Sequence, residues 1–222
     1  MEGVFPRAMF TILGIPVRDT IVSTWIMMAI IVGAAAIIGR RRPMALEMLV
    51  DFLIDTISGV MGRPAGPYLP LLGTLAIFIA FANLLSILPT IPLPNGRMFP
   101  IVSPTRDINT PLSLALVVFF SVHYFGIRAR GIVGYFKAMA SPIFMLPLEL
   151  VGQLSRTLSL TLRLFGNVLS TEMIVAVIFA LVPLIVPLPL VAFSMLTGVL
   201  QAYIFTVLAT VYIGAGLEAS EQ

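Results

Sequence analysis

The sequence has no cysteine and a single histidine, and only 10% of its 222 residues are charged. The absence of cysteine excludes disulfide bonds, thiolate metal sites and a cysteine nucleophile. With His123 as the only histidine, a histidine-rich metal site is excluded as well. No basic block carries interleaved aromatic residues, so nucleic-acid binding has no support. No P-loop pattern is present, which argues against a nucleotide bound directly by this chain.

What the sequence does contain is apolar residues, which make up 59% of the chain. Soluble domains have about 45–50% apolar and about 25% charged residues, and here the excess comes in long runs. The N-terminal residues lack the ordered basic, apolar and small-residue regions of a cleaved signal peptide. We therefore expect an all-α integral membrane protein that lies in the lipid bilayer and is inserted by its first membrane helix.

About five stretches are suited to cross a membrane, since a spanning helix needs about 20 mostly apolar residues. The last two are the longest, and at 1.5 Å per residue the fourth exceeds a hydrocarbon core of about 30 Å. We expect both of these helices to be strongly tilted. The expected membrane helices are residues 20–38, 68–88, 110–126, 142–181 and 190–213.

Positive charges indicate the orientation of these helices. Arginines 40–42 follow the first expected span, and residues 128–137 carry three more basic residues after the third. Basic residues beside a span stay on the cytoplasmic side, so residues 1–19 should be an external segment and residues 214–222 a cytoplasmic tail. Residues 89–109, rich in proline and with an Asn-Gly pair, should form an external loop.

Residues 45–62 predict an amphipathic interfacial helix instead of a span. Apolar residues fall on one helical face, while Glu47, Asp51 and Asp55 form an acidic stripe four residues apart. Such a helix lies at the membrane interface or against a partner protein. An ordinary surface helix between two spans explains the same pattern, and the sequence leaves both interpretations open.

One face of the fourth expected membrane helix carries a ladder of polar residues. Glu149, Arg156 and Arg163 are seven residues apart and point within about 20° of one direction, with Gln153 and Asn167 nearby. A charge inside a bilayer costs about 2.5–3.5 kcal/mol on insertion scales and usually marks an ion path. For Glu149 and Arg156, a structural ion pair at the membrane edge is the alternative.

Arg163 is harder to explain as a structural residue. It lies deep in the apolar run 158–165, and no acidic residue is three or four positions away. An arginine side chain stays protonated in proteins. Arg163 therefore needs an aqueous cavity or an anionic partner on another chain, unless it extends to a membrane interface.

The last expected helix has a second polar stripe. Ser194, Thr197 and Gln201 share one face, and Tyr212 points in a similar direction. If the two long helices pack antiparallel, Gln201 could hydrogen-bond to Arg163. Ordinary polar packing between membrane helices is the alternative.

These residues resemble a known family. The string Leu-Ser-Leu-Thr-Leu-Arg-Leu-Phe-Gly-Asn at residues 158–167, with Leu148-Glu149 before it, is similar to subunit a of the rotary F-type ATP synthase. Residues 201–208 with Val211-Tyr212 look like that family's last helix. Its earlier landmarks match Asn83-Leu84-Leu85, Leu88-Pro89, Pro104-Thr105 and Asp107-Ile108-Asn109, in the same order.

The resemblance implies a stator that faces a rotor ring (the c-ring) and is held by a peripheral stalk (subunit b), in a bacterial plasma (inner) membrane. Two offset half-channels would conduct H⁺ or Na⁺ to and from the rotor carboxylates, with no cofactor and with ATP chemistry elsewhere in the complex. Arg163 matches the family's essential arginine, a fixed cation that favours the ionised form of a passing carboxylate and blocks a direct leak. The ion-pathway positions carried over are Gln201, Asn167, Glu172, Glu149, Ser159, Tyr212, Asn83, Asn109 and Ser194.

Two departures leave the transported ion open. In many members Glu172 has a histidine counterpart on the last helix, and that position is Ser194 here; an aspartate of some members is Ser86. The N-terminus is also short, as in sodium-pumping variants. We expect protons, with sodium as the alternative ion.

Other classes fit less well. The alternative function is a secondary ion-coupled transporter, although the two halves of the chain show no internal repeat. A membrane enzyme would need a nucleophile and a base within the spans, and this sequence offers no such pair. A purely structural assembly subunit would not need Arg163.

Overall fold

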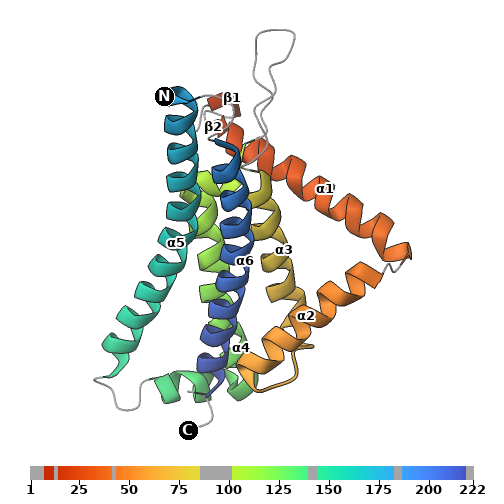
Figure 1. The fold of residues 1–222 in the computed structure, drawn as a ribbon. Coiled ribbons are helices and arrows are strands. Elements are labelled where there is room, and N and C mark those ends of the chain that lie inside the picture. Colours follow the sequence, from red (N-terminus) through yellow and green to blue (C-terminus); the bar gives the residue numbers. More distant parts are fainter. Residues whose placement is uncertain are drawn as a thin grey trace.

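The computed structural model describes residues 8–12, 15–41, 44–85, 102–139, 145–182 and 187–218. Within these ranges the chain is almost entirely helical, with four helices long and apolar enough to cross a membrane and one shorter apolar helix (Figure 1). The expected all-α membrane architecture is therefore confirmed. Much of the predicted external loop (residues 89–101), the end of the predicted second span (residues 86–88) and the end of the predicted tail (residues 219–222) lie outside the described residues.

A short antiparallel hairpin precedes the first helix, in a segment for which the sequence predicted no strand. β1 (Ala8–Ile12) pairs with β2 (Ile15–Arg18). α1 (Asp19–Arg41) follows directly. The Asp19 carboxylate accepts the backbone N–H of Thr20 at 2.9 Å, and an acidic residue in the first turn stabilises the positive end of the helix dipole.

α1 diverges from the other helices (Figure 1). Its buried residues, Thr20, Ser23 and Met27, all lie in its first three turns. Beyond them, apolar side chains such as Val32 and Ile37 are about two-thirds exposed (65% and 66%). α1 is therefore attached to the protein at one end, and the rest of its surface is open to lipid or to a partner.

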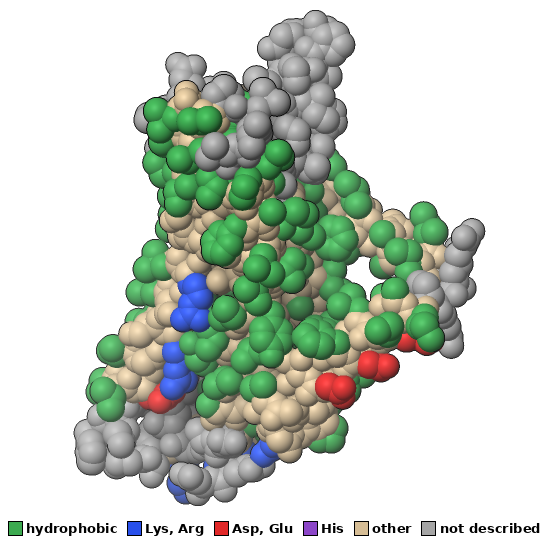
Figure 2. Space-filling model, viewed as in Figure 1, with side chains coloured by type: hydrophobic (Ala, Val, Ile, Leu, Met, Phe, Trp, Pro, Cys, Tyr) green, Lys and Arg blue, Asp and Glu red, His purple; other side chains and the backbone are tan. Residues whose placement is uncertain are grey.

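α2 (Met44–Met61) runs back towards the bundle (Figure 1). Leu53, Ile57 and Met61 are buried at the end where it meets the other helices. Acidic side chains line its outer surface (Figure 2). These exposed residues are Glu47, Asp51 and Asp55.

α3 (Leu69–Leu85) is followed by a short 3-10 helix, η1 (Pro104–Arg106), and by α4 (Asn109–Met139). α4 continues well past residue 126 and contains a kink at Gly131, whose φ of 76° is non-helical. That left-handed conformation is strained for residues with a side chain and suits glycine. The kink folds the last turns of α4 back, so that the Tyr135 ring packs against Gly126.

α5 (Met145–Leu181) and α6 (Pro187–Glu218) are antiparallel neighbours (Figure 1). With 37 and 32 residues, they are about 55 and 48 Å long at 1.5 Å per residue. α6 lies at the centre and packs against α2, α3, α4 and α5. Its buried residues recur every three or four positions, which forms one continuous core face: Ala202, Phe205, Ala209, Ile213 and Leu217.

Candidate functional site

Arg163 lies near the middle of α5 on the face that points away from the core. Its side chain is exposed, and it makes no hydrogen bond or ion pair with the residues that the structure describes. Leu158 and Leu162 beside it are 55% and 57% exposed, whereas Leu160 and Leu164 are buried against the bundle. The same helix thus presents an apolar core face inward and a cation outward.

Gln201 occupies the facing helix but does not bond to this arginine. Its side chain is 6% exposed, and its Nε2 has no hydrogen-bond partner among the described residues. α5 and α6 do pack antiparallel, yet no hydrogen bond joins Gln201 to Arg163 in the described chain. Arg163 is therefore still without a protein partner within the described part of this chain.

The first turns of α5, at the lower end of this helix in Figure 1, hold a polar group around Glu149. Arg156 Nη1 lies 3.9 Å from Glu149 Oε1, and Gln153 donates to the same oxygen at 3.3 Å. The guanidinium of Arg156 is 5.5 Å from the centre of the Tyr212 ring on α6. The Glu149–Arg156 ion pair is thus formed, and the pathway roles of Glu149 and Tyr212 stay predictions.

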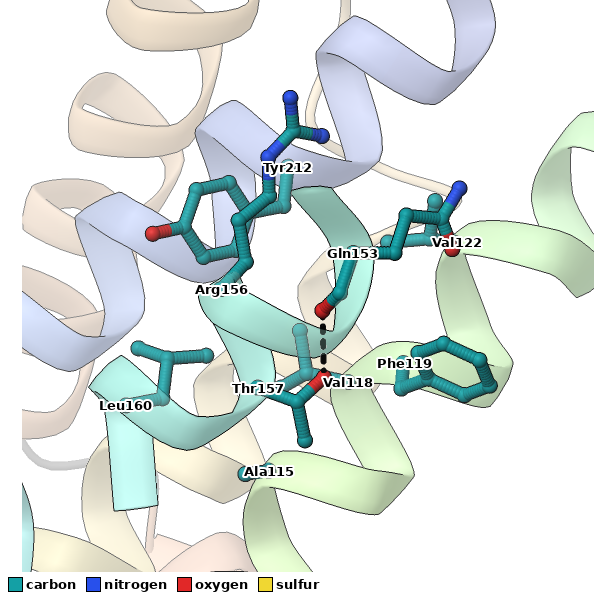
Figure 3. Close-up of a pocket in the computed structure, with 9 residues that line it drawn as sticks. All are labelled: Ala115, Val118, Phe119, Val122, Gln153, Arg156, Thr157, Leu160 and Tyr212. Atoms are coloured by element: carbon teal, nitrogen blue, oxygen red, sulfur yellow. Dashed lines mark hydrogen bonds between the residues drawn. The ribbon is translucent and has the colours of Figure 1, made fainter. Parts of the chain in front are cut away.

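A small cavity opens beside this group, between α4, α5 and α6 (Figure 3). Its volume is about 20 Å³, room for about one water molecule. Gln153 and Arg156 approach it from α5 and Tyr212 from α6, while Phe119 and Val122 of α4 close it with apolar atoms. In Figure 3 the amide of Gln153 and the guanidinium of Arg156 point to different sides, and the wall of the cavity is almost entirely apolar.

A larger cavity lies at the opposite end of α5 and α6, the end that also carries β1 and β2 (the hairpin end). Its volume is about 260 Å³. Three polar side chains reach it from the two helices, namely Thr171, Glu172 and Ser194, and the remaining lining is apolar. Glu172 and Ser194, paired by the sequence argument, are therefore brought to one cavity.

Asn83 is buried between α3 and its neighbours, with 2% of its surface exposed. Its Nδ2 donates to the Gly198 carbonyl of α6 at 2.9 Å, and its Oδ1 accepts from Thr105 Oγ1 of η1 at 3.1 Å. The side chain connects three elements, and its role in the ion pathway stays a prediction. Asn109 lies at the start of α4, where it is exposed and donates to Asp107 Oδ1 at 2.8 Å.

Arg163 stands between these two polar groups. At 1.5 Å per residue, it is about 21 Å along α5 from Glu149 and about 14 Å from Glu172. Ser159 shares the exposed outer surface, and Asn167 is half-buried. The described residues contain no group of three or more His, Cys, Asp or Glu side chains placed to hold a metal ion.

The sequence argument missed a charged cluster at the hairpin end. Arg18 Nη1 lies 2.8 Å from Asp107 Oδ2, and Arg106 Nη2 lies 3.3 Å from Asp19 Oδ2. Arg106 Nη1 also lies 4.0 Å from Glu172 Oε2. The available signal was the dipeptide Arg-Asp, which occurs directly before the first and third spans and here pairs crosswise.

In this cluster, the pair Arg18–Asp107 is held in its charged form. Burial tends to raise the pKa of Asp107, but the hydrogen bond and charge of Arg18, with donors from Asn109 and Thr20, outweigh burial and lower that pKa overall. The hydrogen bond that Arg18 donates to Asp107 in turn raises the pKa of Arg18. Both groups are therefore charged near neutral pH.

A second group that the sequence argument missed lies where α4 folds back. The Tyr135 hydroxyl hydrogen-bonds to His123 Nδ1 at 3.2 Å. Gly126 makes this possible, because an added Cβ there would lie 2.4 Å from Tyr135 Cε2. The turn at Gly131 brings together residues that a straight helix would separate by about 18 Å.

Comparison with known proteins identifies the family of the chain. The model of the family described as ATP synthase A chain matches residues 20–214. The chain is 44% identical to "ATP synthase subunit a 2" of Bradyrhizobium sp. (strain BTAi1) over 94% of this chain and 93% of that protein. It is 40% identical to "ATP synthase subunit a 1" of Chlorobium luteolum over 91% of both chains. The "ATP synthase subunit a 2" of Picosynechococcus sp. is 38% identical, over 93% of this chain and 88% of its own.

The family model covers most of the chain, and the matched range includes α5 with Arg163. The chain is a multi-pass membrane protein of the ATP synthase subunit a family, the ion-translocating and non-catalytic membrane subunit of that complex.

Proposed function

We propose that this chain is the stator channel of a rotary ATP synthase, in which two offset half-channels carry ions to and from the rotor carboxylates. The cavity with Glu172 and Ser194 is the candidate half-channel at the hairpin end. The polar group of Glu149, Gln153 and Tyr212 is the candidate at the other end. Arg163 lies between them and separates the two routes.

The observation that carries this proposal is the outward position of Arg163. A charge exposed on an apolar membrane helix costs about 2.5–3.5 kcal/mol on insertion scales, and no described residue of this chain neutralises it. An ionised carboxylate on the rotor ring would supply the missing anion. Apolar side chains exposed on α5 and α6 offer the surrounding contact surface: Leu158, Leu162, Met195, Leu196, Val199 and Leu200.

The proposed mechanism follows from one fixed cation. A rotor carboxylate that arrives loaded meets Arg163, which favours its ionised form, so that it releases its ion to one half-channel. It is reloaded from the other half-channel after leaving the arginine. The same positive charge repels ions that would pass straight through. Each unit charge that leaked across 100 mV would waste about 2.3 kcal/mol.

The transported ion is H⁺, with Na⁺ as the alternative. Ser194 stands where many family members have a histidine, so the hairpin-end cavity offers hydroxyl and carboxylate oxygens and no imidazole. Oxygen ligands accept a hydrated proton or a sodium ion. Rotor residues outside this chain contribute to the choice.

We propose that the hairpin end lies outside the cell and the end of α6 in the cytoplasm, because basic residues follow the first and third spans. On this orientation the exposed acidic stripe of α2 is a contact for the stalk subunit b. Glu47→Gln, Asp51→Asn and Asp55→Asn combined should reduce stalk retention during purification. Full retention of the stalk by this triple variant would contradict the contact.

The test of the proposed function is ATP-driven ion uptake into vesicles that carry the whole complex. Arg163→Ala should abolish uptake, while Arg156→Ala, which removes an arginine paired within this chain, should retain it in part. Labelled sodium uptake that persists with a protonophore would identify sodium as the ion. Normal pumping by Arg163→Ala would refute the proposal, and solute uptake by the purified chain alone would favour a secondary transporter.

A further inference from the structure

The hairpin end contains five charged side chains that form one connected cluster. They come from four parts of the fold: Arg18 from β2, Asp19 from α1, Arg106 and Asp107 from η1 and its end, and Glu172 from α5. Arg18 and Asp107 form the outer pair at 2.8 Å. Arg106 forms the inner connection, 3.3 Å from Asp19 and 4.0 Å from Glu172.

Arg106 is therefore shared between two carboxylates. Its side chain is 7% exposed, that of Asp19 is 13% exposed and that of Glu172 is 18% exposed. Charges this far from water are stable only when paired. The shorter distance shows that Asp19 is the primary partner and that Glu172 is only partly neutralised.

Glu172 is the carboxylate of this cluster that an arginine neutralises least. Its distance to an arginine, 4.0 Å, is the longest of the three carboxylates, and it is also the one that faces the cavity of about 260 Å³. One monovalent cation in that cavity would neutralise Glu172.

The cavity provides oxygen atoms for such a cation. Thr171 Oγ1 donates to the Asn167 carbonyl and Ser194 Oγ donates to the Leu190 carbonyl, each at 2.8 Å. Because each hydroxyl uses its hydrogen for its own helix, its oxygen lone pairs remain for a ligand. A carboxylate and two hydroxyl oxygens are the ligand types that hard cations prefer. No charged side chain of α6 lines this cavity among the described residues.

We propose that Arg106 is a positioning residue that sets how tightly Glu172 holds a single monovalent cation, H⁺ or Na⁺, in the hairpin-end cavity. When the cation is bound, Glu172 is neutralised and Arg106 stays with Asp19. When the cation leaves for the rotor, Arg106 shifts towards Glu172 and compensates the exposed negative charge. Asp19 thus affects how tightly Glu172 holds the cation, because it competes with Glu172 for Arg106. The inference rests on the proposed function, because it assumes that this cavity is the external half-channel.

The experiment measures ATP synthesis by the whole complex in proteoliposomes at constant membrane potential, while the cation concentration on the hairpin side is varied. Arg106→Gln removes the positive charge that lies 4.0 Å from Glu172. The apparent KM for the cation should then fall by at least about tenfold, as expected for loss of an opposite charge at this distance. The kcat should fall as well, because the cation leaves for the rotor more slowly.

Asp19→Asn should have the opposite effect. It removes the competing carboxylate, so Arg106 turns fully to Glu172, and the apparent KM should rise. Arg106→Lys keeps the charge and should return the KM towards the wild-type value. Arg18→Gln is the matched control, because it removes the same charge at the outer pair and should change the KM less than Arg106→Gln.

Three results would overturn the proposal. These are an unchanged KM in Arg106→Gln, KM shifts of the same sign in Arg106→Gln and Asp19→Asn, or an equal shift in Arg18→Gln. If Arg106→Gln does not assemble, an unchanged KM in Asp19→Asn is sufficient to overturn it. Failure of the proposed function is distinguished by Arg163→Ala: inactive Arg163→Ala with unchanged KM values in the cluster variants refutes this inference alone.

Discussion

Asn83→Ala is expected to destabilise the subunit, because Asn83 joins α3 to both α6 and η1. The substitution removes a 2.9 Å bond to the Gly198 carbonyl and a 3.1 Å bond from Thr105. Hydrogen bonds between membrane helices contribute about 0.6 kcal/mol on average and up to about 1.7 kcal/mol. Two bonds therefore give a loss of about 1–3 kcal/mol in the free energy of unfolding.

The assay is the temperature at which the subunit leaves the detergent-solubilised complex. For a chain of this size, 1 kcal/mol corresponds to about 2–4 °C in Tm, so Asn83→Ala should lower it by roughly 3–10 °C. Thr74→Ala is the matched control on the same helix, since the Thr74 hydroxyl bonds only to the Pro70 carbonyl within α3 and is exposed. Its effect should stay within about 0.5 kcal/mol.

A double-mutant cycle with Thr105→Val isolates the bond between the two side chains. A coupling energy of about 0.6 kcal/mol or more is expected. An unchanged Tm in Asn83→Ala, together with no coupling to Thr105→Val, would refute the structural explanation. If ion uptake were lost in that case, the predicted pathway role of Asn83 would explain it better.

Two further variants test other contacts. Asp107→Asn should lower the Tm at neutral pH, because it removes the ion pair with Arg18. The folded-state pKa of Asp107 is depressed below its ordinary value of 3.8. The stability that the ionised carboxylate contributes is therefore present above pH 3.8 and is lost as the pH falls below that value. A Tm difference that is the same at pH 7 and pH 3 would exclude the ion pair with Arg18 as its cause. Gly126→Ala should cost about 1–3 kcal/mol, since its Cβ would lie 2.4 Å from the Tyr135 ring. Gly152→Ala, with open space around the added Cβ, should be close to neutral, and equal Tm values for the two alanine variants would contradict the packing.

The overall architecture could be predicted from the sequence because membrane helices are a local property. Each needs only a run of apolar residues, and the backbone of such a run has no alternative in lipid but to bond internally. Fold-back of α4 was not predicted, because a single glycine directly after Arg130, beyond the expected end of the span, does not by itself indicate a kink. Nor was the hairpin before α1, whose strands are only five and four residues long.

Part of the candidate site could also be predicted from the sequence, and part could not. Arg163 was identifiable because a lone arginine in an apolar run is conspicuous, and the structure places it outward as a partner-facing cation requires. The pairs Arg18–Asp107 and Arg106–Asp19 join residues 89 and 87 positions apart. Such pairs depend on how α1 and η1 meet in space, which no local pattern contains.

The central position of α6 has a consequence for biosynthesis. α6 follows every other described helix in the chain, yet α2, α3, α4 and α5 all pack against it. While the ribosome is still producing α5, residues such as Leu72, Ile79 and Val118, all buried in the finished core, have no common surface to pack on. The inserted helices must then be held by lipid or by an insertion factor. A message that ends before α6 would leave α4 packed on α5 but separated from α2 and α3, because α6 is the helix that joins these two groups. Such a product is expected to be a substrate for membrane proteases and not a partly working channel.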